Sequence, residues 1–195
     1  MINADIQGHS FAINLFLVRH GEILSNIKRV YAGKSPEPLT EKGRSQAYET
    51  GRGLRSFNID ALYTSPIKRA VETAEIIGRI IDKEYIVMDE FREMELGPWE
   101  GLSEDEIARL YPQEWKTWQK RPAELFIDGR ETLYMVLDRA LSGIKEIVNK
   151  HSYSNIIIVT HVAIIRVLIL CSQNKSLNLY KTIDIPNGGI FRLSL

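Results

Sequence analysis

The sequence predicts an α/β protein in which helices cover a layered β-sheet. Short apolar runs that suit buried strands alternate along the chain with longer segments of helical periodicity. Residues with functional character directly follow several of these apolar runs. Ligands of such sheets bind beyond the carboxyl ends of the strands. We therefore expect the functional site to lie where the predicted strands end.

The predicted strands are short and rich in β-branched and other apolar residues. In chain order they are Asn14–Val18, Ala61–Tyr63, Tyr85–Met88, Ile156–Thr160 and Phe191–Leu195. The fourth run, I-I-I-V-T, has the clearest pattern of a strand buried on both faces. The first run ends at Arg19, where a turn is expected.

The predicted helices lie between these strands. They are Glu41 to about Phe57, Pro66 to about Ile81, Glu131 to Lys150 and a helix that begins after His161. Thr40 is a suitable N-cap for the first of them. Ser65 is the expected N-cap of the second, with Pro66 at the first helical position.

The pattern changes between residues 91 and 130. Residues that break regular structure open this stretch: Gly97, Pro98 and Gly101. Ser103 then caps a helix, with Glu106 at the spacing of a capping box. Aromatic side chains follow at helical intervals: Tyr111, Trp115 and Trp118. We therefore expect one domain over residues 1–195, with a small helical cap at about 91–130.

Composition argues against several classes of function. The chain has 25 Lys+Arg and 25 Asp+Glu, so its net charge is +0, and nucleic acid and anionic membranes are poor partners. Its single cysteine excludes a disulfide framework. The first ten residues have no features of a secretory signal, and no apolar run approaches the ~20 residues that span a bilayer. We expect a cytoplasmic protein.

Basic residues and histidines follow the predicted strands. Arg19 and His20 follow the first strand, Arg69 lies in the first turn of the second helix, and His161 follows the fourth strand. Arginine grips phosphate with two parallel hydrogen bonds, and neutral imidazole is a nucleophile. Phosphoryl transfer needs both groups, together with an acid for the leaving oxygen. Singly, each residue is more often structural or solvated, so their joint occurrence carries the prediction.

The sequence around His20 is similar to a known signature. Arg19-His20-Gly21-Glu22, with Asn26 six residues after the histidine, resembles the R-H-G-E-x-x-x-N motif of the histidine phosphatase superfamily, the phosphoglycerate mutase-like proteins. Later blocks resemble that family in the same order: Ser65-Pro66-x-x-Arg69-Ala70-x-x-Thr73-Ala74, Glu93-x-x-x-Gly97-x-Trp99-Glu100-Gly101, Glu131-Thr132 with Arg139, and Val159-Thr160-His161. The resemblance implies a three-layer αβα sandwich with a mostly parallel central sheet and helices on both faces.

The resemblance implies a role for each matching residue. His20 would be the nucleophile and would become phosphohistidine. Arg19, Arg69 and Asn26 would hold the phosphoryl oxygens, and His161 would add a hydrogen bond or charge to the same oxygens. We expect the two arginines to lower the pKa of His20 and keep its ring neutral.

Glu93 is implied as the general acid and base. It would donate a proton to the leaving group and later take one from the attacking water, and no metal or other cofactor is implied. Burial is expected to raise its pKa. The chain departs from the family where Val162 and Ala163 replace the usual Gly-Gly, Ile23 replaces threonine and Pro36 replaces aspartate. The backbone N–H of Val162 remains a predicted phosphate-binding group.

Three functions fit these residues. A phosphatase acting on a small phosphorylated metabolite is favoured, because the stretch between Glu93 and Glu131 is shorter than in the family's mutases. A phosphoglycerate mutase-type transfer is the second, and a non-catalytic phospho-ligand-binding module is the third. The identity of the metabolite and the oligomeric state, a homodimer included, stay open. If Trp115 and Trp118 face the cleft, the substrate is bulkier than phosphoglycerate.

Overall fold

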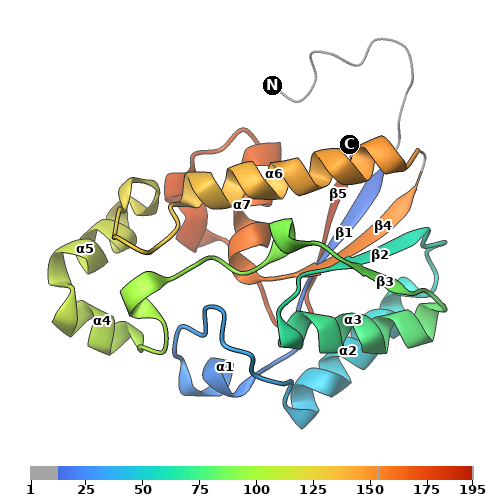
Figure 1. Cartoon of the computed structure of the whole chain (residues 1–195), viewed down its shortest axis with the longest axis horizontal. Coiled ribbons are helices and arrows are strands. Elements are labelled where there is room, and N and C mark those ends of the chain that lie inside the picture. Colours follow the sequence, from blue (N-terminus) through green and yellow to red (C-terminus); the bar gives the residue numbers. More distant parts are fainter. Residues whose placement is uncertain (1–12, 153, 195) are drawn as a thin grey trace.

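The computed structural model describes residues 13–152 and 154–194 (Figure 1). Leu195, the expected end of the last strand, and the first ten residues lie outside them. One sheet has the strand order β3-β2-β4-β1-β5. The strands are β1 (Asn14–Arg19), β2 (Ala61–Thr64), β3 (Tyr85–Val87), β4 (Asn155–Thr160) and β5 (Ile190–Ser194). Only β5 pairs antiparallel within this sheet, so the mostly parallel arrangement is confirmed.

Helices connect the strands and cover both faces of the sheet. The α-helices are α1 (Leu24–Lys28), α2 (Glu41–Leu54), α3 (Lys68–Ile81), α4 (Glu104–Leu110), α5 (Pro112–Lys120), α6 (Leu133–Lys150) and α7 (Val162–Ser172). Short 3₁₀ turns are η1 (Asp89–Phe91), η2 (Gly97–Trp99), η3 (Pro122–Glu124) and η4 (Leu177–Thr182). In Figure 1, α6 and α7 lie above the sheet, and α2 and α3 lie below it.

The three layers follow from the alternation of side chains along each strand. Leu15 and Leu17 of β1 pack into the core that holds the apolar side chains of α6 and α7. Phe16 and Val18 point to the other face and pack with those of α2 and α3. All four are at most 2% exposed, and burying such a side chain contributes about 1.5–3 kcal/mol. The predicted α/β sandwich is therefore confirmed.

The first predicted helix is correct at its start and too long at its end. Thr40 is the N-cap of α2, and its hydroxyl accepts a hydrogen bond of 3.0 Å from the Gly43 N–H. The helix ends at Leu54, not near Phe57. Phe57 is 41% exposed. It lies beyond the helix, so helical periodicity no longer sets its direction.

The prediction that Ser65 caps the second helix is wrong. Helix α3 begins at Lys68, with Ile67 as its N-cap. The Ser65 hydroxyl accepts from the Ile67 N–H at 3.2 Å and also lies 2.7 Å from Nε2 of His161. Ser65 therefore lies in the turn before α3 and does not cap the helix. Its side chain joins this turn to His161, the residue that follows β4.

The segment between η2 and α6 holds the short helices α4 and α5, at the left of Figure 1. The capping box is confirmed: Ser103 Oγ accepts from the Glu106 N–H at 3.3 Å, and the Glu106 carboxylate accepts from the Ser103 N–H at 2.8 Å. Trp118 is buried and packs against Tyr180, with ring centroids 5.2 Å apart. That residues 91–130 act as a cap stays a prediction.

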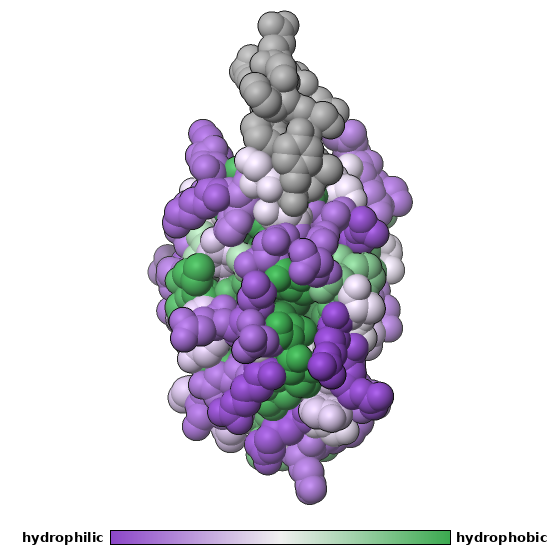
Figure 2. Space-filling view, turned by 90° about the vertical axis from the view of Figure 1, so that its right-hand side faces the viewer, coloured by the Kyte–Doolittle hydropathy of each residue, from purple (hydrophilic) through white to green (hydrophobic). Residues whose placement is uncertain are grey.

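Figure 2 shows the opposite end of the molecule, where hydrophilic side chains surround a narrow hydrophobic strip. The edge strand β3 has only three residues, and Ile86 and Val87 are each 50% exposed. So short an edge offers few backbone groups for pairing with another chain. In the part of the chain described, no helix combines the length and apolar character needed to cross a membrane.

Candidate functional site

The carboxyl ends of β1, β2 and β4 meet at one edge of the sheet. Arg19 lies opposite Thr160 in the β1–β4 ladder, so the next residues, His20 and His161, leave the sheet side by side. Their ring centroids are 5.1 Å apart. Strand β2 pairs with β4 and leads into α3, which brings Arg69 to the same edge. The topology thus gathers residues that are far apart in the sequence.

The His20 ring has a defined tautomer. Its Nδ1 lies 2.7 Å from the Gly21 carbonyl oxygen, and because a carbonyl only accepts, Nδ1 carries the hydrogen. Nε2 then has a lone pair, and it accepts a hydrogen bond of 3.1 Å from Nε of Arg69. Burial lowers the pKa of His20 well below its usual value, and the charges of Arg69 and Arg19 add to this shift. The ring is therefore neutral.

Arg69 is held by backbone as well as by His20. It is 1% exposed, and its two terminal nitrogens donate to the carbonyl oxygens of Ser35 and Gly33, at 2.9 and 2.7 Å. These bonds fix the plane of the guanidinium group. They leave one N–H on each terminal nitrogen, so Arg69 has fewer donors to offer a phosphoryl group than an unengaged guanidinium.

Arg19 is anchored at one end only. Its NH1 group donates to the Ile185 carbonyl oxygen, and its Nε is buried without a hydrogen-bond partner among the described residues. Burial lowers the pKa of Arg19, while the charge of Glu93 opposes that shift. An unpartnered guanidinium donor at a cavity wall suits the binding of an anion.

Glu93 lines the same cavity as Arg19. It is 8% exposed, and its Oε1 accepts a hydrogen bond of 2.9 Å from the Met94 N–H. Burial raises the pKa of Glu93, although the charges of Arg69 and Arg19 oppose this change. The protonated carboxyl group is therefore favoured more than in water, as a general acid requires.

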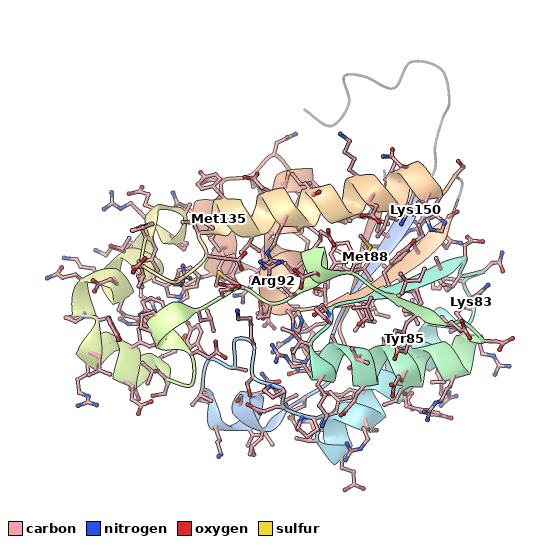
Figure 3. All side chains as sticks on the ribbon, in the orientation of Figure 1. Lys83, Tyr85, Met88, Arg92, Met135 and Lys150 are labelled. Atoms are coloured by element: carbon pink, nitrogen blue, oxygen red, sulfur yellow. The ribbon has the colours of Figure 1, made fainter. Side chains whose placement is uncertain are left out.

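Arg139, which belongs to the fourth motif block, holds the backbone segment that carries Glu93. Its NH1 group donates to the carbonyl oxygens of Glu90 and Arg92, at 2.8 and 2.9 Å, and NH2 donates to that of Glu93 at 3.3 Å. Arg139 also forms a two-point ion pair with Glu131, at 2.8 and 2.9 Å. In Figure 3 the segment that carries Arg92 runs under α6, the helix of Arg139. The pair fixes the backbone that carries Glu93.

His161 lies next to His20, with ring centroids 5.1 Å apart, and is completely buried. Its Nε2 shares a hydrogen bond of 2.7 Å with the Ser65 hydroxyl, whereas its Nδ1 has no partner in the described part of the structure. Burial lowers the pKa of His161 well below its usual value, followed by the charge of Arg69. His161 is therefore neutral, and of the predicted site residues it is the one that does not line the cavity.

Asn26 lines the cavity with a defined orientation of its amide. Its Oδ1 accepts from the Ile23 N–H at 3.2 Å and from Nδ2 of Asn187 at 3.0 Å. Sequence reasoning missed Asn187, because an asparagine before two glycines reads as a turn residue. Val162, the first residue of α7, also lines the cavity.

The cavity at this edge has a volume of about 650 Å³. Its lining includes the predicted residues Arg19, His20, Asn26, Arg69, Glu93 and Val162. Other residues that line it include Tyr31, Met94, Trp118, Arg166, Tyr180 and Lys181. Residues 13–152 and 154–194 contain no cluster of three His, Cys, Asp or Glu side chains that could hold a metal ion.

Comparison with protein families agrees with this geometry. The sequence model described as the histidine phosphatase superfamily (branch 1) matches residues 15–195. The chain belongs to the histidine phosphatase superfamily. The match includes every residue that the motifs predicted for the site, from Arg19 to Val162.

Curated members of the superfamily resemble the chain over most of its length. It is 34% identical over 153 residues to the uncharacterized phosphatase PhoE of Bacillus subtilis (strain 168), covering 78% of this chain and 74% of that protein. It is 30% identical over 156 residues to phosphoserine phosphatase 1 of Hydrogenobacter thermophilus, covering 80% and 74%.

Solved structures of the superfamily share the fold. Bacillus stearothermophilus YhfR superimposes with a TM-score of 0.86 at 33% identity, over 93% of this chain and 90% of that one. A phosphoserine phosphatase mutant from Entamoeba histolytica, in complex with phosphoserine, gives a TM-score of 0.82 at 25% identity, over 92% and 89%.

Proposed function

We propose that this superfamily member is a phosphatase that hydrolyses phosphomonoesters of small metabolites without a metal ion, through a phosphohistidine at His20. One observation carries the proposal: the unprotonated Nε2 of His20 lies within 3.1 Å of Arg69 at a cavity that Glu93 also lines. Nucleophile, phosphate-binding cation and acid are thus together. The relatives named as phosphatases support the same function.

In the first step Nε2 of His20 attacks phosphorus and the ester P–O bond breaks. Glu93 gives its proton to the leaving oxygen, so the product leaves as an alcohol. Arg19, Arg69 and the NH₂ group of Asn26 neutralise or hydrogen-bond the non-bridging oxygens. The bond from Nδ1–H to the Gly21 carbonyl stabilises the positive charge that the ring acquires.

In the second step water attacks the phosphohistidine. The Glu93 carboxylate takes a proton from that water, the P–N bond breaks, and its electron pair returns to Nε2. Inorganic phosphate leaves, and both His20 and Glu93 return to their starting protonation states. The Ser65 hydroxyl, which accepts from Ile67, can donate its hydrogen to Nε2 of His161. Nδ1 of His161 then carries a hydrogen for a phosphoryl oxygen.

We infer that the alcohol part of the substrate occupies the part of the cavity lined by Tyr31, Met94 and Trp118, under a cap formed by residues 91–130. Trp118 lines this space, which supports a substrate bulkier than phosphoglycerate. Arg166 donates through Nε to the Ile183 carbonyl oxygen at 2.8 Å and lies 4.9 Å from the centre of the Tyr180 ring. No carboxylate of the described residues lies within 4 Å of it, so it supports a substrate with a second anionic group. Two relatives are named phosphoserine phosphatases, and phosphoserine has a carboxylate.

The test is phosphate release from a panel of phosphomonoesters in excess chelator. The panel contains p-nitrophenyl phosphate, phosphoserine, 3-phosphoglycerate and larger sugar phosphates. We expect hydrolysis that chelator does not reduce and that His20→Ala abolishes. Isomerisation of phosphoglycerate that depends on a bisphosphate primer would instead establish a mutase. Phosphate binding without turnover of any ester would establish a binding module.

Location and assembly are proposals as well. We infer a cytoplasmic location, since the single cysteine is compatible with a reducing compartment. Cell fractionation tests this. A homodimer is the alternative to a monomer, and light scattering of the purified protein distinguishes the two.

A further inference from the structure

The loop between η4 and β5 reaches the site from the far end of the sequence. It contains Pro186-Asn187-Gly188-Gly189. Nδ2 of Asn187 donates two hydrogen bonds, one of 3.1 Å to the backbone carbonyl oxygen of His20 and one of 3.0 Å to Oδ1 of Asn26. A primary amide has two N–H hydrogens, so both are used on residues of the proposed site.

The loop itself is firmly held. The Gly188 N–H donates to the Arg19 carbonyl at 3.1 Å, and the Arg19 N–H donates to the Gly189 carbonyl at 3.1 Å. The Thr50 hydroxyl donates to the Gly188 carbonyl at 2.8 Å. Gly188 has a φ of +71°, a region that favours glycine. Asn187 therefore projects from a backbone fixed on both sides.

We propose that Asn187 is a positioning residue that sets the orientation of the Asn26 side-chain amide. Oδ1 of Asn26 accepts from both Asn187 and the Ile23 N–H, so the oxygen is turned away from the ligand and the NH₂ group is presented to it. Without Asn187 the amide loses one of its two fixed partners. A rotated amide would place its oxygen against a phosphoryl oxygen, which repels it.

The proposal rests on the proposed function only for the activity readout. Its central prediction is a coupling between two positions, which inorganic phosphate binding can measure in the absence of turnover. We expect Asn187→Ala to weaken phosphate binding and to lower kcat/KM by about tenfold, since the Asn26 amide would no longer be held with its NH₂ group toward the phosphoryl oxygens. We expect Asn26→Ala to remove the whole contribution of the Asn26 amide to phosphate affinity and to kcat/KM.

A double-mutant cycle distinguishes positioning from general damage. The set is Asn187→Ala, Asn26→Ala and the double variant, each measured for phosphate affinity by calorimetry and for kcat/KM. If Asn187 acts through Asn26, the double variant is no worse than Asn26→Ala. Additive losses at the two positions would overturn the proposal, as would unchanged phosphate affinity in Asn187→Ala.

Thr50→Val is the matched control, because it removes one hydrogen bond from the same loop and does not touch Asn26. We expect it to lower the free energy of unfolding while kcat/KM and phosphate affinity stay within about twofold. Equal losses of phosphate affinity in Thr50→Val and Asn187→Ala would assign the effect to the loop as a whole and overturn the positioning role. If wild-type protein binds phosphate but hydrolyses nothing, the proposed function fails while the cycle still tests Asn187.

Discussion

Nε of Arg69 donates a 3.1 Å hydrogen bond to Nε2 of His20, the atom that we propose attacks phosphorus. The pair explains how a nucleophile is kept ready in a buried site. A cation beside the ring disfavours its protonation, and the bond orients the lone pair. A bound phosphoryl group would have to take the place of Arg69 at Nε2, and this exchange links substrate binding to exposure of the nucleophile.

Two variants of Arg69 separate its charge from its geometry. Arg69→Gln removes a positive charge that lowers the pKa of His20. The pKa of His20 should therefore rise in this variant, and the acidic limb of its kcat/KM profile should move to higher pH. Arg69→Lys keeps the charge, so the acidic limb of its kcat/KM profile should stay near that of the wild type. Both should lower kcat/KM by about 10²-fold or more, because neither can form paired N–H bonds. Identical acidic limbs in Arg69→Gln and wild type would contradict the electrostatic role.

Glu93→Gln tests the general acid. Burial raises the pKa of Glu93, and activity that requires its protonated form falls as pH rises through that value. Glutamine cannot supply the proton, so kcat/KM for an alkyl phosphate, which reports the steps up to release of the alcohol, should fall by about 10²–10⁴-fold. p-Nitrophenolate is a stable leaving group, so the same variant should lose less of its kcat/KM for p-nitrophenyl phosphate. Steady-state kinetics with both esters measures the difference, and equal losses would assign Glu93 another role.

The buried histidines predict acid destabilisation. The pKa values of His20 and His161 are well below 6.5 in the folded protein, so the unfolded chain binds protons that the native state does not. Below about pH 6.5 each neutral histidine should lower the free energy of unfolding by about 1.4 kcal/mol per pH unit, until its folded pKa is reached. Urea unfolding between pH 5 and 8 should show a shallower slope in His161→Gln than in wild type. Equal slopes would mean that His161 is protonated in the folded state.

Arg166→Met tests the anionic subsite. We expect KM for a carboxylate-bearing ester such as phosphoserine to rise by about tenfold or more, because a hydrogen-bonded ion pair is lost. KM for p-nitrophenyl phosphate, which has no second anion, should change by about twofold at most. Lys116→Met removes an exposed charge away from the cavity lining and controls for net charge. Parallel changes with both esters would place the role of Arg166 at the phosphoryl group.

Local patterns were sufficient for much of the fold. Thr40 and Ser103 cap helices as predicted, because a cap depends on residues three positions apart. Ser65 has the same local pattern of an N-cap, but it does not cap a helix. Its hydroxyl is hydrogen-bonded to His161, which is 96 residues away. A pattern of neighbouring residues cannot show that a distant histidine competes with the helix for this hydroxyl.

For the site, the motifs named six residues that line the cavity, together with His161, which does not line it. They did not specify the hydrogen bonds or the exposure of these side chains. They did not indicate that Arg69 is engaged by two backbone carbonyls, nor that Arg139 holds the segment of Glu93. Each of these contacts joins a side chain to a backbone group of a distant segment. Side-chain identity alone does not specify such partners, because every residue offers the same carbonyl.

By itself the sequence determined the alternation of strands and helices, the family, and the reactive residues at the strand ends. These properties depend on periodicity and on short motifs, which are local. The tertiary structure alone decided which nitrogen of His20 has the lone pair, and which face of the Asn26 amide meets the cavity. The reason is physical: the hydrogen bond from Asn187 to His20 spans 167 residues, and it exists only when the chain is folded.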